Sequence, residues 1–304
     1  MEFLKYNQKP GGIIKAKNNT EILSFITGTK NNIDAKTVEA FGEEWSKFSS
    51  FSEEEITRTG IQYFDIIDDK ILNKNSIVLD AGCGSGRWTK YIAGKVNFVE
   101  ATDPSKAVYA AAELNKKESN VRITQAEISN IPFDDNSFDL IICLGVLHHI
   151  PDTKKALQDV VKKLKPGGKI LLYLYYNLDN RGTLYKFIFH CSSLLRRMIS
   201  KMPAHIKKFS CDIIAIIIYL PLIYFSRMLL FIFGMKKWIK KIPLSYYTDK
   251  SFNIIRNDSL DRFGTPLEQR FSKKEIEIMM LQSGLIEIVF SSQEPYWHAV
   301  GKKV

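Results

Sequence analysis

The segment VLDAGCGSGR, residues 78–87, constrains the fold of this 304-residue chain more than any other part. An apolar run ends here in an acid, Asp80. Glycines then occupy three alternate positions, Gly82, Gly84 and Gly86. Glycines at this spacing allow a sharp turn and a close backbone approach to a ligand, and the start of a helix offers N–H groups that lack an intrahelical partner. The pattern predicts a strand, a turn and a helix that bind a nucleoside; the alternative is a plain structural turn.

The acid before the turn indicates the kind of nucleoside. The dinucleotide fingerprint G-x-G-x-x-G is absent, because the residue three past Gly86 is Thr89. A carboxylate at Asp80 would repel a pyrophosphate and attract the ammonium of an amino-acid-bearing nucleoside. The turn therefore favours S-adenosylmethionine (SAM) over NAD, and Cys83 joins Asp80 and the three glycines as a candidate cofactor contact.

A second apolar run, residues 96–102, ends in Asp103 and Pro104, and an alanine-rich helical stretch, residues 105–117, follows. Asp103 lies about 20 residues beyond the glycines, where a carboxylate can accept hydrogen bonds from both ribose hydroxyls of a nucleoside. An N-cap for the following helix, with Pro104 at its first position, is the alternative, and the two roles are compatible. We assign both residues to the cofactor site.

Strands alternate with helices along residues 78–176. Predicted strands occupy residues 121–124, 138–144 and 169–176, and a polar helix spans residues 152–165. Residues 138–144 are nearly all apolar, which is typical of a strand covered on both faces. The alternation predicts an α/β fold, a Rossmann-like doubly wound sheet of seven mostly parallel strands, with the ligand at the carboxyl ends. Residues 285–291 and 296–301 would add the last, antiparallel part.

The run IPFDDNSFDLIICLGVLHHIPD, residues 131–152, and the phrase LKPGGKILLYLY resemble class I SAM-dependent methyltransferases, in particular a type 11-like subgroup with an insertion before the last helix. In this family an acid after the third strand meets the adenine amino group, and its apolar neighbour packs on the ring. Glu127 and Ile128 match these positions, although aspartate is more usual there. Leu144, at the end of the fourth strand, is assigned to the cofactor site as well.

The resemblance extends to both flanks. AFGEEWSKF, residues 40–48, looks like the N-terminal cap whose helix closes over the methionine end of SAM, so Trp45 is a candidate cofactor contact; Trp45 and Phe48 could equally be core residues. Residues 261–276 and 296–303 resemble the tail of the same subgroup, with the last helix over residues 271–283.

Two histidines follow the fourth strand, where the methyl group would lie. Methyl transfer to a hydroxyl requires removal of its proton, and a histidine titrates near neutral pH. We rank His149 first and His148 second as the base; the alternative is that the pair caps and packs the turn. Four further residues are candidate substrate contacts because they follow the fifth strand or precede the last helix: Tyr175, Tyr176, Asp261 and Arg262.

The positive charge of the chain is local. The formal net charge is +10, but residues 181–250 contain 13 lysines and arginines against two aspartates, which leaves −1 for the remainder. Nucleic acid is therefore an unlikely partner. The segment at 143–146 also lacks the Asp/Asn-Pro-Pro-aromatic motif that amino-methylating enzymes of nucleic acids share. The four cysteines are scattered and no cysteine–histidine cluster has metal-ligand spacing, so we expect free thiols, no metal and a cytoplasmic location.

The same basic segment is apolar. Residues 184–202 form a basic amphipathic helix, and residues 213–233 are long enough to span a bilayer. A single crossing would separate the last helix and strands from their sheet, so we expect Pro221 to divide the run into two shorter helices that rest on anionic headgroups on the inner face of the membrane. A lid packed on the sheet, a contact between two copies in a homodimer, and a re-entrant hairpin are the alternatives.

The predicted organisation has four parts: an N-terminal extension (1–35), a SAM-binding core with its cap helices (36–176), a basic hydrophobic helical insertion over 184–241 within residues 177–260, and a C-terminal completion of the sheet (261–304). We predict a SAM-dependent O-methyltransferase of an amphiphilic or membrane-associated small acceptor, such as a lipid-linked glycan or a quinone-like compound. The alternatives are a SAM-binding regulatory protein at the membrane without catalysis, and a soluble nucleic-acid methyltransferase.

Overall fold

The computed structural model describes residues 3–26, 28, 32–47, 51–68, 70–233 and 242–304. The chain forms two compact units. The first contains Met1–Asp179 and Leu267–Val304, and the second contains Asn180–Pro266. The second unit thus extends six residues beyond residue 260, the predicted end of the insertion, and includes the helix α10 (Phe252–Gly264).

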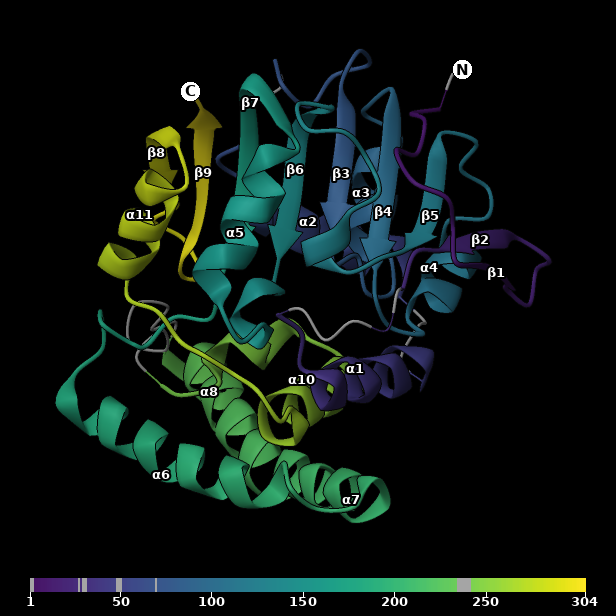
Figure 1. The fold of residues 1–304 in the computed structure, drawn as a ribbon. Helices are drawn as coiled ribbons and strands as arrows, with labels where there is room; N and C mark the ends of the chain where they lie inside the picture. The colour runs from purple at the N-terminus through teal and green to yellow at the C-terminus, as the bar shows by residue number, and fades with distance from the viewer. Residues whose placement is uncertain (1–2, 27, 29–31, 48–50, 69, 234–241) are drawn as a thin grey trace. The chain divides into compact units, whose positions relative to one another are not determined.

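The first unit is built on a nine-stranded sheet in the order β1-β2-β5-β4-β3-β6-β7-β9-β8 (Figure 1). Its strands are β1 (Gly12–Lys15), β2 (Glu21–Ser24), β3 (Ile77–Ala81), β4 (Phe98–Asp103), β5 (Val121–Gln125), β6 (Phe138–Leu144), β7 (Leu164–Tyr173), β8 (Leu285–Phe290) and β9 (His298–Lys303). The strands from β5 to β7 run parallel, and β9 runs antiparallel to both of its neighbours. The predicted doubly wound α/β class is confirmed.

The count of seven strands is wrong by two, because the N-terminal extension adds a hairpin to the sheet. β1 pairs antiparallel with β2, and β2 pairs parallel with β5 through Leu23 and Thr124. Ile22 is completely buried in this hairpin. The apolar patch of the extension therefore lengthens the sheet beyond the strand that precedes Glu127.

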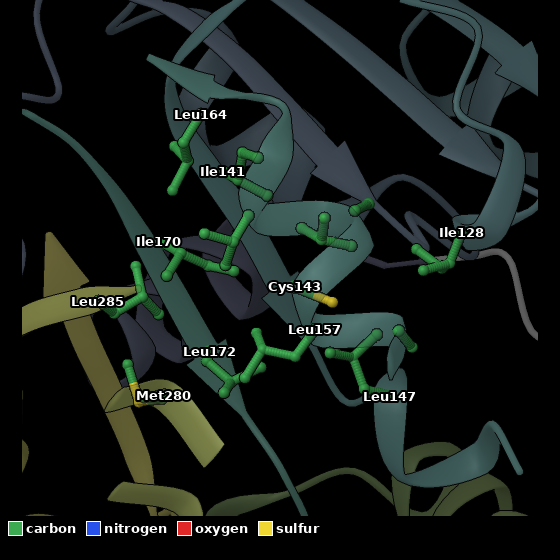
Figure 2. Close-up of a cluster of buried hydrophobic side chains, with 14 of the residues drawn as sticks. Ile128, Ile141, Cys143, Leu147, Leu157, Leu164, Ile170, Leu172, Met280 and Leu285 are labelled. Atoms are coloured by element: carbon green, nitrogen blue, oxygen red, sulfur yellow. The ribbon is translucent and has the colours of Figure 1, made fainter. Parts of the chain in front are cut away.

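Helices cover both faces of the sheet. They are α1 (Ala35–Lys47), α2 (Glu53–Tyr63), α3 (Arg87–Ala93), α4 (Val108–Leu114), α5 (Thr153–Lys162) and α11 (Lys273–Gln282), with the short helices η1 (Ile128–Asn130) and η2 (Leu147–His149). On one face, α5 and α11 pack on alternate strand residues such as Ile141 and Leu172 (Figure 2). On the other face, α2 and α3 pack on the intervening residues, such as Ile142 and Leu171. Both sides of β6 are therefore buried, which accounts for its apolar sequence.

The second unit is helical. It contains α6 (Thr183–Ile199), α7 (Ala204–Ile214), the π-helix η3 (Ala215–Tyr219), α8 (Leu220–Phe233), η4 (Ser245–Asp249) and α10. Its own core joins Cys211, Ala215 and Tyr219 to Ile255 and Phe263 of α10.

Pro221 does not divide the apolar run, so that expectation is wrong. α7, η3 and α8 follow one another without interruption from Ala204 to Phe233. A proline lacks an N–H and crowds the carbonyl four residues earlier, which usually breaks or kinks a helix. Here a wider π turn lies immediately before the proline and accommodates its ring, so the helix continues.

Candidate active site

The glycine turn adopts a backbone that other residues rarely adopt. The φ angles of Gly82, Gly84 and Gly86 are 82°, 53° and 78°. A Cβ at Gly82 would lie 2.5 Å from the side chain of Val146, so the loop after β6 packs directly on the turn. The N–H groups of Gly82 and Cys83 both donate to the carbonyl of Thr102, at 2.7 and 2.9 Å. The turn is thereby fixed between the ends of β4 and β6.

Asp80 is a buried carboxylate at the end of β3. Its side chain accepts a hydrogen bond from the Thr89 hydroxyl at 2.6 Å, and the residue is 1% exposed. Burial raises the pKa of Asp80 to about 7, and the charge of Asp103 adds to this increase. A ligand cation next to Asp80 would favour the ionised form.

SAM affinity should therefore rise with pH up to about pH 7, because below its raised pKa Asp80 must release a proton before it can attract the ligand ammonium. We expect a gain of up to about tenfold per pH unit if the coupling is complete. Calorimetry at several pH values measures this slope, and Asp80→Asn should flatten it. The ligand-free protein should also lose stability as the pH rises from about 4 to about 7, since the unfolded chain ionises this group first. An unchanged affinity slope in Asp80→Asn would contradict the assignment.

Asp103 connects the turn to the segment after β4. One carboxylate oxygen accepts the N–H of Gly84 at 3.0 Å, and the other accepts the N–H and the hydroxyl of Ser105, at 2.8 and 2.6 Å. Burial raises its pKa. Helix α4 begins only at Val108, so the role of Asp103 as a helix N-cap is wrong and the carboxylate caps a turn instead. The intervening Pro104 accepts a hydrogen bond from Gln125 through its carbonyl.

The ends of β5 and β6 carry three further predicted cofactor contacts, Glu127, Ile128 and Leu144. Glu127 precedes η1 and is 8% exposed, and burial raises its pKa. Ile128 joins the core cluster beneath α5, and Leu144 ends β6 in a nearly buried position. The carboxyl ends of β3 to β6 thus carry the predicted acids and apolar residues in the order that a nucleoside bound across a doubly wound sheet requires.

The two histidines differ in tautomer. Nδ1 of His149 lies 2.7 Å from the carbonyl oxygen of Leu267. A carbonyl only accepts, so Nδ1 carries the hydrogen and Nε2 of a neutral ring carries the lone pair. Nδ1 of His148 instead accepts the N–H of Tyr175 at 3.3 Å, and the Tyr175 ring stacks on it at 3.9 Å. Burial lowers the pKa of His148 well below its usual value, so this ring stays neutral.

Residues 267–271, here called the strap, hold both histidines and Tyr175. Besides the Leu267 carbonyl, the strap donates the Gln269 N–H to the His148 carbonyl and the Phe271 N–H to the Tyr175 carbonyl, both at 2.9 Å. Its Arg270 pairs with Glu268 at 2.7 Å and lies over the Tyr175 ring at 5.2 Å. The sequence prediction missed the strap, although it lies within the segment assigned to the family tail. The one signal that could have indicated it is its place directly after Pro266, between two helices.

The other predicted site residues are Tyr176, Asp261, Arg262 and Trp45, and of these Tyr176 lies beside the strap, where its carbonyl accepts a hydrogen bond from Arg270. Tyr176 follows Tyr175 and contacts the ring of Tyr296 at 5.8 Å. Asp261 and Arg262 lie on α10 of the second unit. Trp45 lies in α1, but its side chain is outside the described residues, as is Phe48. Within the described ranges, no group of three His, Cys, Asp or Glu residues could hold a metal.

Comparison with known proteins places the fold among methyltransferases. A family model described as a methyltransferase domain matches residues 79–172. The chain is 31% identical over 137 residues, 44% of its length and 51% of the relative, to the uncharacterized methyltransferase YcgJ of Bacillus subtilis. It is 25% identical over 146 residues, 47% of its length and 62% of the relative, to a ubiquinone biosynthesis O-methyltransferase of Pseudomonas fluorescens. The chain thus spans between half and two thirds of these relatives.

Two solved structures are similar to most of this chain, at low sequence identity. The crystal structure of YcgJ from Bacillus subtilis is 21% identical, with a TM-score of 0.42, over 72% of this chain and 67% of that one. A SAM-dependent methyltransferase from Aquifex aeolicus is 14% identical, with a TM-score of 0.42, over 83% of this chain and 98% of that one.

Proposed function

We propose that the chain is a SAM-dependent methyltransferase, through the methyltransferase domain matched at residues 79–172, and that it transfers the methyl group of SAM to a hydroxyl of a small amphiphilic acceptor. The single observation that supports a hydroxyl acceptor best is the hydrogen bond from Nδ1 of His149 to Leu267, because it directs the lone pair of the ring to Nε2. The similarity to ubiquinone O-methyltransferases, at 25 to 26% identity, also favours an oxygen acceptor.

The residues at the strand ends fit SAM. The three glycines of the turn have positive φ angles, and a glycine turn of this kind allows a ligand to approach the backbone closely. We assign the ammonium to Asp80, the ribose hydroxyls to Asp103 and the adenine amino group to Glu127, with Ile128 against the ring. When bound, SAM supplies an electrophilic methyl group on a sulfonium. The chain contributes the position of the acceptor, the exclusion of water and a base.

The acceptor would lie against an aromatic wall after β7. Tyr173 contacts Tyr63 at 5.3 Å and Tyr175 at 5.9 Å, and Tyr175 stacks on His148. Flat aromatic surfaces of this kind suit a planar ring such as that of a quinol. With SAM held at the strand ends as the methyl donor, Nε2 of His149 would accept the proton of the acceptor hydroxyl, and the imidazolium would keep its bond to the Leu267 carbonyl.

Calorimetry of SAM binding to Asp103→Ala tests the cofactor assignment. Removing this carboxylate should weaken SAM binding by about 1.5 to 3 kcal/mol, because hydrogen bonds to a charged group are lost. Glu113→Ala is the control, since Glu113 lies on the exposed side of α4 and pairs with Lys116 at the surface. If both variants bind SAM like the wild type, the ribose contact is refuted.

Transfer of labelled methyl groups tests the reaction itself. A catechol with an alkyl tail should be methylated, while its amine analogue should react far more slowly. SAM binding without transfer to any hydroxyl acceptor would instead support the interpretation as a regulatory protein without catalysis.

A further inference from the structure

One face of the second unit is a continuous apolar surface. Among the described residues, one helix, His205–Ile232, is long and apolar enough to cross a membrane. Its outward side chains include Phe209, Ile217 and Phe231, which are 67%, 66% and 92% exposed. From residue 209 to residue 232 the charged residues are Asp212 and Arg227, and both have inward partners: Asp212 pairs with Arg256 at 2.7 Å, and Arg227 donates to the Thr248 carbonyl. Water alone would solvate this uncharged face poorly.

The opposite face of the same helix is fixed to a polar helix. α7 packs on α10, and the Ser259 hydroxyl donates to the Cys211 carbonyl at 2.9 Å. α10 carries four charged residues, Arg256, Asp258, Asp261 and Arg262. A membrane-spanning helix would take α10 and these charges into the hydrocarbon, which is strongly unfavourable for charged side chains. The helix is therefore suited to lie in the plane of a surface.

Helix α6 carries an apolar stripe and a basic stripe, in addition to the apolar surface of residues 205–232. It packs on α10, and its Ile199 lies in the core cluster of the second unit. Its apolar residues Phe187 and Met198 are instead exposed, at 64% and 65%. Another stripe of α6 is basic and exposed and contains Lys186 and Arg197, and the exposed Lys201 follows the end of the helix. An apolar stripe beside a basic one is typical of helices that lie at the interface of a bilayer.

A second copy of the chain or an anionic bilayer could cover this surface, and charge distinguishes between them. Residues 180–266 contain 15 lysines and arginines against four aspartates, a net charge of +11. A second copy would bring the same charge into contact with it, which is unfavourable. Anionic lipid headgroups have the complementary charge and offer a hydrocarbon layer for the apolar side chains.

We propose that residues 180–266 form a docking unit for the surface of an anionic bilayer, with the apolar stripes of α6 and of residues 205–232 inserted and the basic stripe at the headgroups. The chain enters this unit after Asp179 and leaves it at Pro266, immediately before the strap that bonds to His149. On the proposed function, the bilayer to which this unit docks would be the source of the acceptor.

Co-sedimentation of the full chain with vesicles tests the docking unit without any turnover. We expect binding to phosphatidylcholine vesicles with about 30% phosphatidylglycerol, weaker binding without the anionic lipid, and a decrease at high salt. Ile217→Glu with Phe231→Glu should weaken binding at least about tenfold, because two inserted side chains become charged. The matched control is Ile278→Glu with Leu281→Glu on α11 of the first unit, which are 41% and 54% exposed and should leave binding unchanged.

Two results would overturn the proposal. The first is wild-type protein that stays in the supernatant with anionic vesicles. The second is a wild-type dimer in light scattering that Ile217→Glu with Phe231→Glu dissociates, in the absence of vesicle binding, since a second copy would then cover the surface. Vesicle binding combined with failure of methyl transfer would refute the acceptor in the proposed function and leave the docking unit standing, so the two failures are distinguishable.

Discussion

Replacing His149 by asparagine should lower kcat by about 10² to 10⁴, the usual contribution of a general base. Asparagine keeps an N–H near the position of Nδ1, so the bond to the Leu267 carbonyl can persist while the lone pair of Nε2 is lost. The positions of the strap and of Tyr175 should therefore remain, and SAM affinity should change little. Steady-state rates at saturating SAM, together with calorimetry of SAM, separate these two effects.

The neighbouring His148 provides the matched control. Asparagine at this position can still accept the Tyr175 N–H, and a ring that burial keeps neutral is a poor proton acceptor. We expect less than about a tenfold loss of kcat for His148→Asn. A larger loss of kcat for His148→Asn than for His149→Asn would mean that His148, and not His149, is the base.

Local pattern was sufficient for the central part of the fold. The strand predicted at residues 138–144 is β6, residue for residue, because a run buried on both faces is apolar at nearly every position, with Asp139 as the exception. The left-handed glycines could be predicted for a similar reason, since only glycine adopts such a backbone without strain. Asp80 and Asp103 were found from their positions at strand ends, because topology alone brings those ends together.

Contacts between distant segments could not be predicted in this way. The Leu267 carbonyl bonds to a ring 118 positions earlier in the chain, and nothing in the strap sequence indicates that partner. The bond from the Thr89 hydroxyl to Asp80 is similar, since it depends on how α3 packs on β3. The continuity of the helix through Pro221 depends on a π turn that has no sequence signature of its own. Asp261 and Arg262 were assigned by proximity to the last helix, but the structure places them on α10 of the second unit.

Gly86→Ala should destabilise the protein by about 3 kcal/mol, the sum of a left-handed backbone that alanine disfavours and a contact that cannot relax. The φ angle of Gly86 is 78°, and its new Cβ would lie 2.9 Å from the Cα of Ala111 and 2.6 Å from Nδ2 of Asn115. The backbone of α4 cannot shift without also moving the segment that begins at Asp103. Urea denaturation should show a lower midpoint with an unchanged slope.

Gly94→Ala adds the same methyl group at the other end of α3 and is the control. Gly94 has a right-handed backbone, with φ −67°, and no atom lies within 4 Å of a Cβ placed there. This substitution should stabilise the protein by about 0.4 to 1 kcal/mol, because it restricts the unfolded chain without strain in the folded one. Opposite changes in stability for the same added methyl group would show that the backbone conformation of the turn, and not the number of glycines, determines whether a side chain is tolerated there. Equal stability of the two variants would mean that the turn and α4 relax around the new methyl group, and the predicted strain at Gly86 would be wrong.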